Sequence, residues 1–415
     1  MKNLSPETRL VHADRLLNRP QSGGVHEATN NSVLFEFEDV QGLVDVFQGK
    51  KAGHVYSRSS SSSAVSLQNI LNDFDKGVGA VVFATGMAAI SATFYSLLKA
   101  GDHIVVSQFL FGNTRSFMSS LENFGIEVTL VDVTEARNVE DAIKANTKMV
   151  FCESIANPVT QVSDLVGIGE LCQSKNILFA LDNTMTPHTL LDAKKVNASL
   201  LLTSLTKYIG GHGNVLGGVV VDTGLYDWAG FSNIDDKYRV TDISQWGLTQ
   251  IKKRGLRDMG ATLAPQSAHQ ISIGLETLSM RMSRTCANAM ALAKYLSTHK
   301  GVDNVFYPGL LEHPQHERAK ALFNRGYGGI LSVELDASID VHQFLNQLKL
   351  IISATHLGDT RTLALPVAST IFYENGAEQR KKMGIRDSLI RISVGIEDIE
   401  DILADFDQAF ETLIK

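Results

Sequence analysis

Lys207 is the side chain in this sequence with the clearest capacity for covalent chemistry. It follows an apolar run, residues 200–203, and precedes the glycine-rich segment 208–218, written YIGGHGNVLGG. Glycines let the backbone come close to a bulky flat ligand. A lysine that is shielded from water has a lowered pKa and becomes an amine nucleophile. A surface lysine beside a turn is the simpler interpretation. A catalytic role for Lys207 is therefore supported only by the residues that accompany it.

Two further features precede Lys207 in the chain. Asp182 ends the apolar run 177–181, where a carboxylate is suited to keep a cofactor ring nitrogen protonated. Gly86, in FATGMAAI (83–90), lies where a strand gives way to a helix, and free N–H groups at a helix start bind phosphate. Singly, Asp182 is equally typical of a turn cap and Gly86 of a plain turn. Their order, followed by the lysine, is typical of enzymes that bind pyridoxal phosphate (PLP).

The elements that must position these residues alternate between short apolar runs and amphipathic stretches. Strands are expected at residues 80–84, 103–107, 127–131, 149–153, 177–181, 200–203 and 218–221. Helices are expected between several of them, at 87–99, 113–124, 139–145 and 164–174. Strands that are apolar throughout and separated by helices predict an α/β fold with a mostly parallel sheet covered on both faces. Ligands of such sheets bind at the carboxyl ends of the strands.

Three regions are expected along the chain. Residues 1–60 are polar and irregular and predict an N-terminal arm, with one short helix near 34–47 and a flexible serine-rich linker at 57–63. Residues 61–260 predict the PLP-binding α/β domain, and residues 261–415 a smaller α+β domain. The smaller domain is expected to contain helices at 275–297 and 396–413 and strands at 304–307, 329–335, 349–353 and 389–393.

Composition narrows the class of protein. The chain has 415 residues and a formal net charge of -7, which argues against a nucleic-acid or anionic-membrane partner. No apolar run approaches the roughly 18 residues of a membrane span, and the N-terminus does not resemble a secretory signal. The three cysteines are scattered without metal-ligand spacing, so no metal site is expected, and their low number indicates a reducing compartment. A cytoplasmic protein is therefore predicted.

Several blocks spread over most of the chain resemble the cystathionine γ-synthase family of PLP enzymes. The most specific blocks are Tyr56-Ser57-Arg58, ATGMAA (84–89), ESIANP (153–158), ALDNT (180–184), SLTKYIGGHG (204–213), LGDTRTL (357–363) and LIRISVGIED (389–398). The family also includes cystathionine lyases, methionine γ-lyase and O-acylhomoserine sulfhydrylases. The resemblance implies a fold-type I PLP-dependent transferase with bound PLP.

The resemblance also implies roles for single residues around the cofactor. Lys207 resembles the lysine that holds PLP as a Schiff base and acts as general base, and Asp182 resembles the partner of the pyridine nitrogen. Asn157 matches an asparagine near the ring hydroxyl. The phosphate cup is expected to consist of Gly86, Met87, Ser204 and Thr206.

Other implied roles concern the substrate and a second chain. Tyr56 and Arg58 match a pair that reaches the phosphate of the neighbouring subunit, which implies a homodimer or homotetramer with shared active sites. Arg391 resembles the arginine that grips the substrate carboxylate, for which a planar bidentate fork suits better than a lysine. A salt bridge at a strand is the alternative for Arg391.

Several positions depart from the family pattern, and three of them bear directly on the site. Phe111 stands where the family usually stacks a tyrosine on the cofactor ring, so stacking is kept but the hydroxyl is lost, and Tyr56 is a candidate to take over part of its acid–base role. Asn113 stands where methionine γ-lyases often carry cysteine. His356 replaces a serine or asparagine, and it is expected either to lie near the substrate or to be packed and inert.

These observations favour γ-replacement on an O-acylhomoserine by cysteine or another thiol. The absent lyase-type cysteine and the GGHGN segment (210–214) incline the prediction toward the synthase and sulfhydrylase branch. A γ-elimination lyase acting on methionine or cystathionine is the second candidate. A PLP-binding scaffold without turnover and an aminotransferase on the same fold are the alternatives from other classes.

Overall fold

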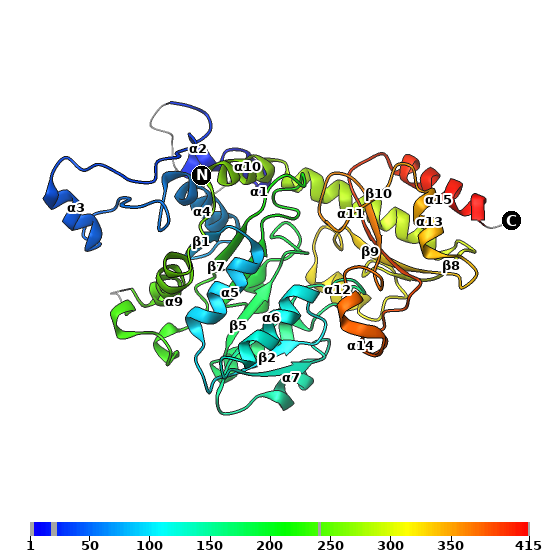
Figure 1. Ribbon diagram of the computed structural model, residues 1–415, viewed down its shortest axis with the longest axis horizontal. Coiled ribbons are helices and arrows are strands. Elements are labelled where there is room, and N and C mark those ends of the chain that lie inside the picture. The colour runs from blue at the N-terminus through cyan, green and yellow to red at the C-terminus, as the bar shows by residue number, and fades with distance from the viewer. Residues whose placement is uncertain (1–3, 18–22, 240–241, 414–415) are drawn as a thin grey trace.

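The computed structural model describes residues 4–17, 23–239 and 242–413. An N-terminal arm leads into a larger part built on a seven-stranded sheet, which is followed by a smaller part built on a five-stranded sheet (Figure 1). The predicted order of arm, larger domain and smaller domain is the order seen here. The exact boundaries at residues 60 and 260 stay a prediction.

The larger sheet has the strand order β1-β7-β6-β5-β4-β2-β3. Its strands are β1 (Gly79–Phe83), β2 (His103–Ser107), β3 (Glu127–Val131), β4 (Thr147–Glu153), β5 (Leu178–Asp182), β6 (Leu200–Ser204) and β7 (Gly218–Asp222). Strand β7 is antiparallel to both of its neighbours, and all other pairs are parallel. The predicted mostly parallel sheet is confirmed, and each expected strand lies within two residues of the observed one.

Helices cover both faces of this sheet, which explains why its inner strands are almost entirely apolar, whereas the edge strand β3 is exposed or half-buried along its length. These helices are α4 (Ser62–Phe74), α5 (Gly86–Leu97), α6 (Gly112–Glu122), α7 (Ala136–Ala142) and α8 (Leu165–Lys175). Successive side chains of β4 enter different cores: Val150 packs with residues of α4 and α8, whereas Phe151 packs with residues of α5 and α6. Alternation along each strand thus fills two separate apolar layers.

The smaller sheet has the order β10-β11-β12-β9-β8. Its strands are β8 (Val302–Phe306), β9 (Ile330–Leu335), β10 (Ile352–Ser353), β11 (Leu363–Pro366) and β12 (Leu389–Ser393). The accompanying helices are α11 (Leu278–Ser297), α12 (His316–Leu322), α13 (Val341–Gln347), α14 (Gly376–Lys382) and α15 (Ile399–Leu413). Helices α11, α13 and α15 contribute to one apolar core with β9 and β12. Strand β11 was not among the predicted strands.

Two segments between the sheets differ from expectation. The single helix predicted at 275–297 is two helices, α10 (Pro265–Glu276) and α11, that meet at Thr277. No element was predicted within residues 226–256. The described part of this segment contains short 3-10 turns, the helix α9 (Trp246–Gln250) and the start of a π-helix, Ile251–Asp258.

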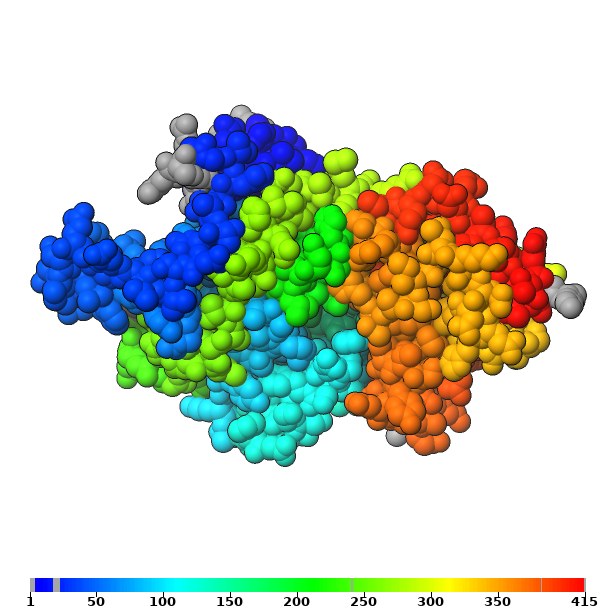
Figure 2. All heavy atoms as spheres, turned by 45° about the horizontal axis from the view of Figure 1, so that its top comes forward, coloured from blue at the N-terminus to red at the C-terminus, as the bar shows by residue number. Residues whose placement is uncertain are grey.

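The arm contains α1 (Pro6–Val11), α2 (Ala13–Leu17) and α3 (Val40–Phe47). Helix α3 projects away from the rest of the molecule, as Figures 1 and 2 show. The serine-rich segment is not a flexible linker. Ser61 caps α4 by accepting the Ala64 N–H at 3.3 Å, and the hydroxyl of buried Ser63 accepts the Asn30 N–H at 3.0 Å. None of the helices described here is long and apolar enough to cross a membrane.

Candidate cofactor and substrate site

The predicted site residues meet in a cavity of about 320 Å³. Figure 2 shows a hollow where the cyan, green and orange segments of the chain come together. Most of the lining comes from strand ends of the larger sheet, and Thr355, Leu357 and Arg391 complete it from the smaller part. The predicted residues in this lining are Gly86, Met87, Phe111, Asn113, Asn157, Asp182, Ser204, Thr206, Lys207 and Arg391.

Lys207 lies in the turn that follows β6, and its amine is largely shielded from water. The backbone N–H of Lys207 donates to the Ser204 carbonyl, and the Lys207 carbonyl accepts the Gly211 N–H at 2.8 Å. Burial, and then the positive charge of Arg391, lower the pKa of Lys207 to about 8. A substantial fraction of the amine is therefore neutral and nucleophilic near physiological pH.

Asp182 ends β5 at the floor of the cavity. Its Oδ1 accepts the Thr184 N–H at 2.9 Å, and the Thr184 hydroxyl accepts the Ser204 N–H at the same distance. Burial raises the pKa of Asp182 above its usual range. A cationic ring nitrogen opposite the carboxylate would reverse that shift, because an opposite charge favours the ionised form. The environment of Asp182 thus fits a protonated heterocycle.

The start of α5 offers N–H groups for a phosphate. Thr85 caps this helix by accepting the Ala88 N–H at 3.0 Å, whereas the first-turn N–H groups of Gly86 and Met87 have no intrahelical acceptor. A Cβ atom at Gly86 would lie 2.8 Å from Cβ of Ser204, so glycine lets this turn pack directly against β6. A dianion is favoured in such a cradle by the helix dipole.

Arg391 presents a buried guanidinium on β12. It is 2% exposed, and Nη2 donates to the carbonyls of Thr355 at 2.9 Å and His356 at 3.0 Å. Its Nε has no hydrogen-bond partner among the described residues, and no acidic side chain pairs with it in that part of the chain. The strand salt bridge considered as an alternative is therefore absent there. A buried cation without a carboxylate partner fits the carboxylate of a ligand.

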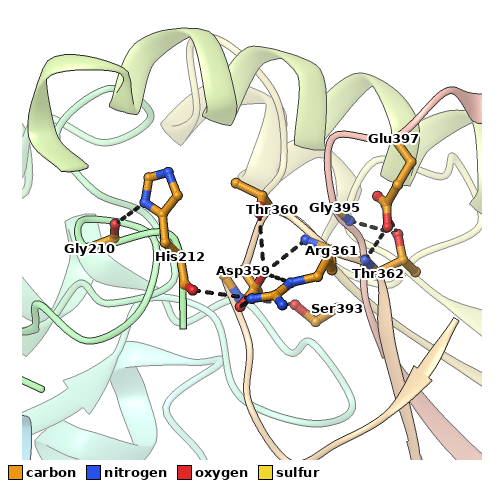
Figure 3. Close-up of polar contacts among 10 residues, drawn as sticks. Gly210, His212, Asp359, Thr360, Arg361, Thr362, Ser393, Gly395 and Glu397 are labelled. Atoms are coloured by element: carbon orange, nitrogen blue, oxygen red, sulfur yellow. Dashed lines mark hydrogen bonds and ion pairs between the residues drawn. The ribbon is translucent and has the colours of Figure 1, made fainter. Parts of the chain in front are cut away.

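A clasp of polar contacts joins the two walls of the cavity (Figure 3). Asp359 pairs with Arg361 at 2.8 Å, and Arg361 Nη2 donates to the His212 carbonyl at 3.2 Å. Gly213 has a φ of +63°, and a Cβ there would lie 2.2 Å from Asp359. The glycine-rich loop after Lys207 is thus held against the loop that carries Leu357.

Residues 7–411 match the sequence model of the family described as Cys/Met metabolism PLP-dependent enzymes. The chain belongs to this family. It is 35% identical to an L-methionine γ-lyase of Fusobacterium nucleatum subsp. polymorphum over 98% of each chain. It is 33% identical to a sulfhydrylase of Fusarium oxysporum over 91% of this chain and 90% of the relative.

A solved structure agrees with this assignment. A Campylobacter jejuni protein assigned as an O-acetylhomoserine (thiol)-lyase superposes with a TM-score of 0.92 at 29% identity, covering 98% of this chain and 100% of that one. That structure holds N'-pyridoxyl-lysine-5'-monophosphate at its position 205. The expected fold-type I architecture, the PLP cofactor and an enzyme acting on sulfur amino acids are therefore confirmed.

Tyr56 and Arg58 do not line the cavity of their own chain. Tyr56 is 45% exposed on the arm, and the guanidinium of Arg58 lies 5.4 Å from the centre of its ring. The Arg58 carbonyl accepts the Thr262 hydroxyl at 2.8 Å. This exposed position is compatible with contact to a second chain, and the shared site stays a prediction.

His356 is partly buried beside the lysine. Its Nδ1 lies 3.5 Å from Nζ of Lys207, and its Nε2 is buried without a hydrogen-bond partner among the described residues. Burial, and then the charge of Lys207, lower the pKa of His356 to about 4. The imidazole is therefore neutral at physiological pH and faces the amine, although it does not line the cavity. Its contact with substrate stays a prediction.

Sequence reasoning missed Glu153 and Thr184, both of which line the cavity. Glu153 ends β4 as Asp182 ends β5, and the two are in register. The rule that drew attention to Asp182, a carboxylate closing an apolar run, would also have selected Glu153.

Proposed function

We propose that this enzyme carries out γ-replacement, joining the carbon skeleton of an O-acylhomoserine to cysteine or another thiol. The observation that carries the proposal is the wall at Phe111 and Asn113. Neither side chain can give a proton to a leaving group. Among the described residues, the ionisable side chains in the lining are Glu153, Asp182, Lys207 and Arg391.

The chemistry of leaving groups gives this observation its meaning. A carboxylate released from an O-acyl ester is a weak base, with a conjugate-acid pKa of about 4, and it leaves without help from an acid. A thiolate has a conjugate-acid pKa of roughly 8.5 and leaves more easily when an acid protonates it. A wall without a tyrosine hydroxyl therefore favours an acylated substrate over a thioether.

The residues that would hold PLP have distinct proposed roles. Lys207 would hold PLP through its aldehyde, and Asp182 would keep the ring nitrogen protonated. Phe111 would stack on the ring, and Asn157 would serve its hydroxyl. Gly86, Met87, Ser204 and Thr206 would bind the phosphate. Bound PLP supplies an electron-withdrawing ring that stabilises the charge left when the substrate loses its Cα proton.

Two side chains of this chain would act on the substrate itself. Arg391 binds the α-carboxylate through its guanidinium fork and so fixes the orientation of the Cα–H bond. Lys207, once free, accepts the Cα proton at Nζ, for which its lowered pKa is well matched. Substrate contact by Asn113 and His356 belongs to the same proposal.

The proposal includes a second copy of the chain. Tyr56 and Arg58 are proposed to serve the phosphate end of a neighbouring cavity, with the Tyr56 hydroxyl also proposed for proton transfers at the substrate carbons rather than to the leaving group. The enzyme would then be at least a homodimer. Mixing Lys207→Ala chains with Arg58→Ala chains, each inactive alone, should restore part of the activity. Absence of any rescue would contradict a shared site.

γ-Elimination is the second candidate, because a relative at 35% identity is named L-methionine γ-lyase. The discriminating assay supplies O-acetylhomoserine with cysteine or sulfide in one reaction and methionine alone in another. We expect thioether or thiol products from the first reaction. The second reaction should release 2-oxobutanoate at least about tenfold more slowly than those products form. Faster release of 2-oxobutanoate from methionine would overturn γ-replacement.

A matched pair of variants sharpens this assay. Phe111→Tyr restores a hydroxyl at the cavity wall and should raise elimination from methionine, whereas Phe111→Leu should lower both reactions through lost stacking. If Phe111→Tyr leaves the ratio of the two reactions unchanged, the leaving-group argument is wrong.

A further inference from the structure

Glu153 is a carboxyl group in the cofactor cavity for which the proposed roles have no use. It ends β4 and is 9% exposed. Its Cα is paired in register with that of Asp182 on β5, and both side chains line the cavity. Two carboxyl groups therefore lie on neighbouring strands, on the same face of the sheet, at the end proposed for the ring nitrogen.

The carboxyl group of Glu153 also makes a contact of its own. Its Oε1 accepts the Phe111 N–H at 3.0 Å. Phe111 is the N-cap residue immediately before α6, and its side chain makes no capping hydrogen bond. Glu153 thus fixes the backbone of the residue whose ring lines the cavity.

Burial and the neighbouring carboxylate oppose the ionisation of Glu153, and the N–H groups of Phe111 and Asn157 favour it more weakly. Burial, and then the negative charge of Asp182, raise the pKa of Glu153 to about 8. Burial also raises the pKa of Asp182, but the Thr184 N–H stabilises its anion, and the proposed ring cation would face it. The other ionisable groups nearby are Lys207 and Arg391, which line the same cavity, and the Cys152 thiol, whose pKa burial raises.

We propose that Glu153 is a positioning residue of this site: as a neutral carboxylic acid it leaves Asp182 as the single anion beside the cofactor ring, and it holds Phe111 in place. The inference rests on the proposed cofactor roles of Asp182 and Phe111. It is independent of whether the later steps are replacement or elimination, because both begin with loss of the Cα proton.

Ionisation of Glu153 would place a second negative charge where the reaction itself develops negative charge. The rate of Cα proton removal should therefore fall as pH rises through the pKa of Glu153. Glu153→Gln keeps a neutral group with an acceptor oxygen, so it should lose this alkaline fall and retain the rate at pH 7. Glu153→Ala removes the acceptor for the Phe111 N–H and should lose rate at every pH.

The experiment measures exchange of the Cα hydrogen of L-alanine in heavy water by proton NMR, with the PLP-loaded enzyme, between about pH 6.5 and 9.5. The variants are Glu153→Gln and Glu153→Ala. Glu334→Gln is the matched control, because Glu334 is 4% exposed on β9, has a pKa raised by burial, and does not line the cavity. The absorbance band of the bound cofactor is titrated over the same range.

A second measurement needs neither cofactor nor turnover. Because the pKa of Glu153 is raised in the folded state, its contribution to stability is greatest below the ordinary glutamate range, near 4.5, and is lost as pH rises toward about 8. The stability of the apoprotein relative to Glu153→Gln should therefore decline across that window, as followed by chemical denaturation. Glu153→Gln should cost less than about threefold in exchange at pH 7, and Glu153→Ala about tenfold or more.

Three results would overturn the proposal. The first is a Glu153→Gln enzyme that keeps the wild-type alkaline fall, as Glu334→Gln should. The second is a Glu153→Gln enzyme that is folded but as impaired at pH 7 as Glu153→Ala, including one that no longer binds PLP. The third is an apoprotein stability difference that does not change with pH. A product assay that identified a lyase would overturn γ-replacement but would leave these outcomes unaffected.

Discussion

The two walls of the cavity are built in different ways. The wall of the larger part consists of strand and helix ends, where Gly86, Asp182 and Lys207 are fixed by the hydrogen bonds of one sheet and one helix. The wall of the smaller part consists of Arg391 and a loop, residues 354–362, that a few polar contacts hold in place. We infer that the first wall serves bond making and the second recognition. Changes in the first should lower kcat, and changes in the second should raise KM.

The largest effect is expected on the first wall. Lys207→Ala should lower turnover of an amino-acid substrate by roughly a thousandfold, because it removes both the covalent anchor and the base. Lys76→Ala serves as control, since Lys76 pairs with Asp192 on the surface far from the cavity lining. Comparable turnover in Lys207→Ala and wild type would refute the role of this wall.

On the second wall, Arg391→Gln should raise KM for the amino-acid substrate by about 10- to 100-fold, because a hydrogen bond to a charged carboxylate is lost. The expected change in kcat is much smaller. Steady-state kinetics separate the two parameters. An unchanged KM with a much lower kcat would show that Arg391 serves bond making rather than recognition.

The same variant tests whether the charge of Arg391 on one wall influences Lys207 on the other. Arg391 is the second cause of the lowered pKa of Lys207, so Arg391→Gln should raise that pKa above about 8. The neutral amine then appears only at higher pH, and the pH profile for PLP uptake by the apoprotein should shift upward. A fluorescence assay of uptake between pH 6.5 and 10 measures this, and an unshifted profile would argue against electrostatic coupling.

A smaller effect is expected at the phosphate end. Gly86→Ala forces a Cβ to within 2.8 Å of Ser204, so the Kd for PLP should rise about tenfold through displacement of the turn. Gly42→Ala on α3, where the nearest atom would be 3.3 Å away, should leave the Kd unchanged. Equal Kd values for both variants and wild type would show that this turn does not bind the phosphate.

The smallest effect concerns the clasp. Arg361→Ala removes the ion pair with Asp359 and the contact to the His212 carbonyl. Because the Arg361 side chain is 58% exposed, KM should rise only about two- to fivefold. Arg284→Ala, which removes an exposed pair with Asp398, provides the comparison. A kcat loss larger than the KM change would mean that the clasp positions Lys207 rather than the recognition loop.

Sequence reasoning succeeded where local pattern and packing agree. The inner strands of the larger sheet are buried on both faces, so an apolar run is sufficient to locate them. Asp182 ends β5, and Lys207 follows β6. Family blocks supplied Arg391. No local pattern could reveal its burial or the lack of an acidic partner among the described residues.

The failures have physical reasons as well. Strand β11 is four residues long and ends at Pro366, which a strand pattern disfavours. The π-helix Ile251–Asp258 carries the polar sequence IKKRGLRD, and its buried Ile251 and Leu256 pack in the core that contains α5. Only the tertiary structure defines such a helix. Glu153 could have been selected by the rule that selected Asp182, but its pairing with Asp182 across the sheet is visible only in the tertiary structure.

The central claim is that the Lys207 amine bonds the aldehyde of PLP. The most direct test is reduction of the PLP-loaded enzyme with borohydride, followed by proteolysis and mass spectrometry of the pyridoxyl-labelled peptide. The account predicts a single labelled lysine at position 207 and loss of the absorbance band near 420 nm on reduction. A label on another lysine, or a band that survives in Lys207→Ala, would contradict it.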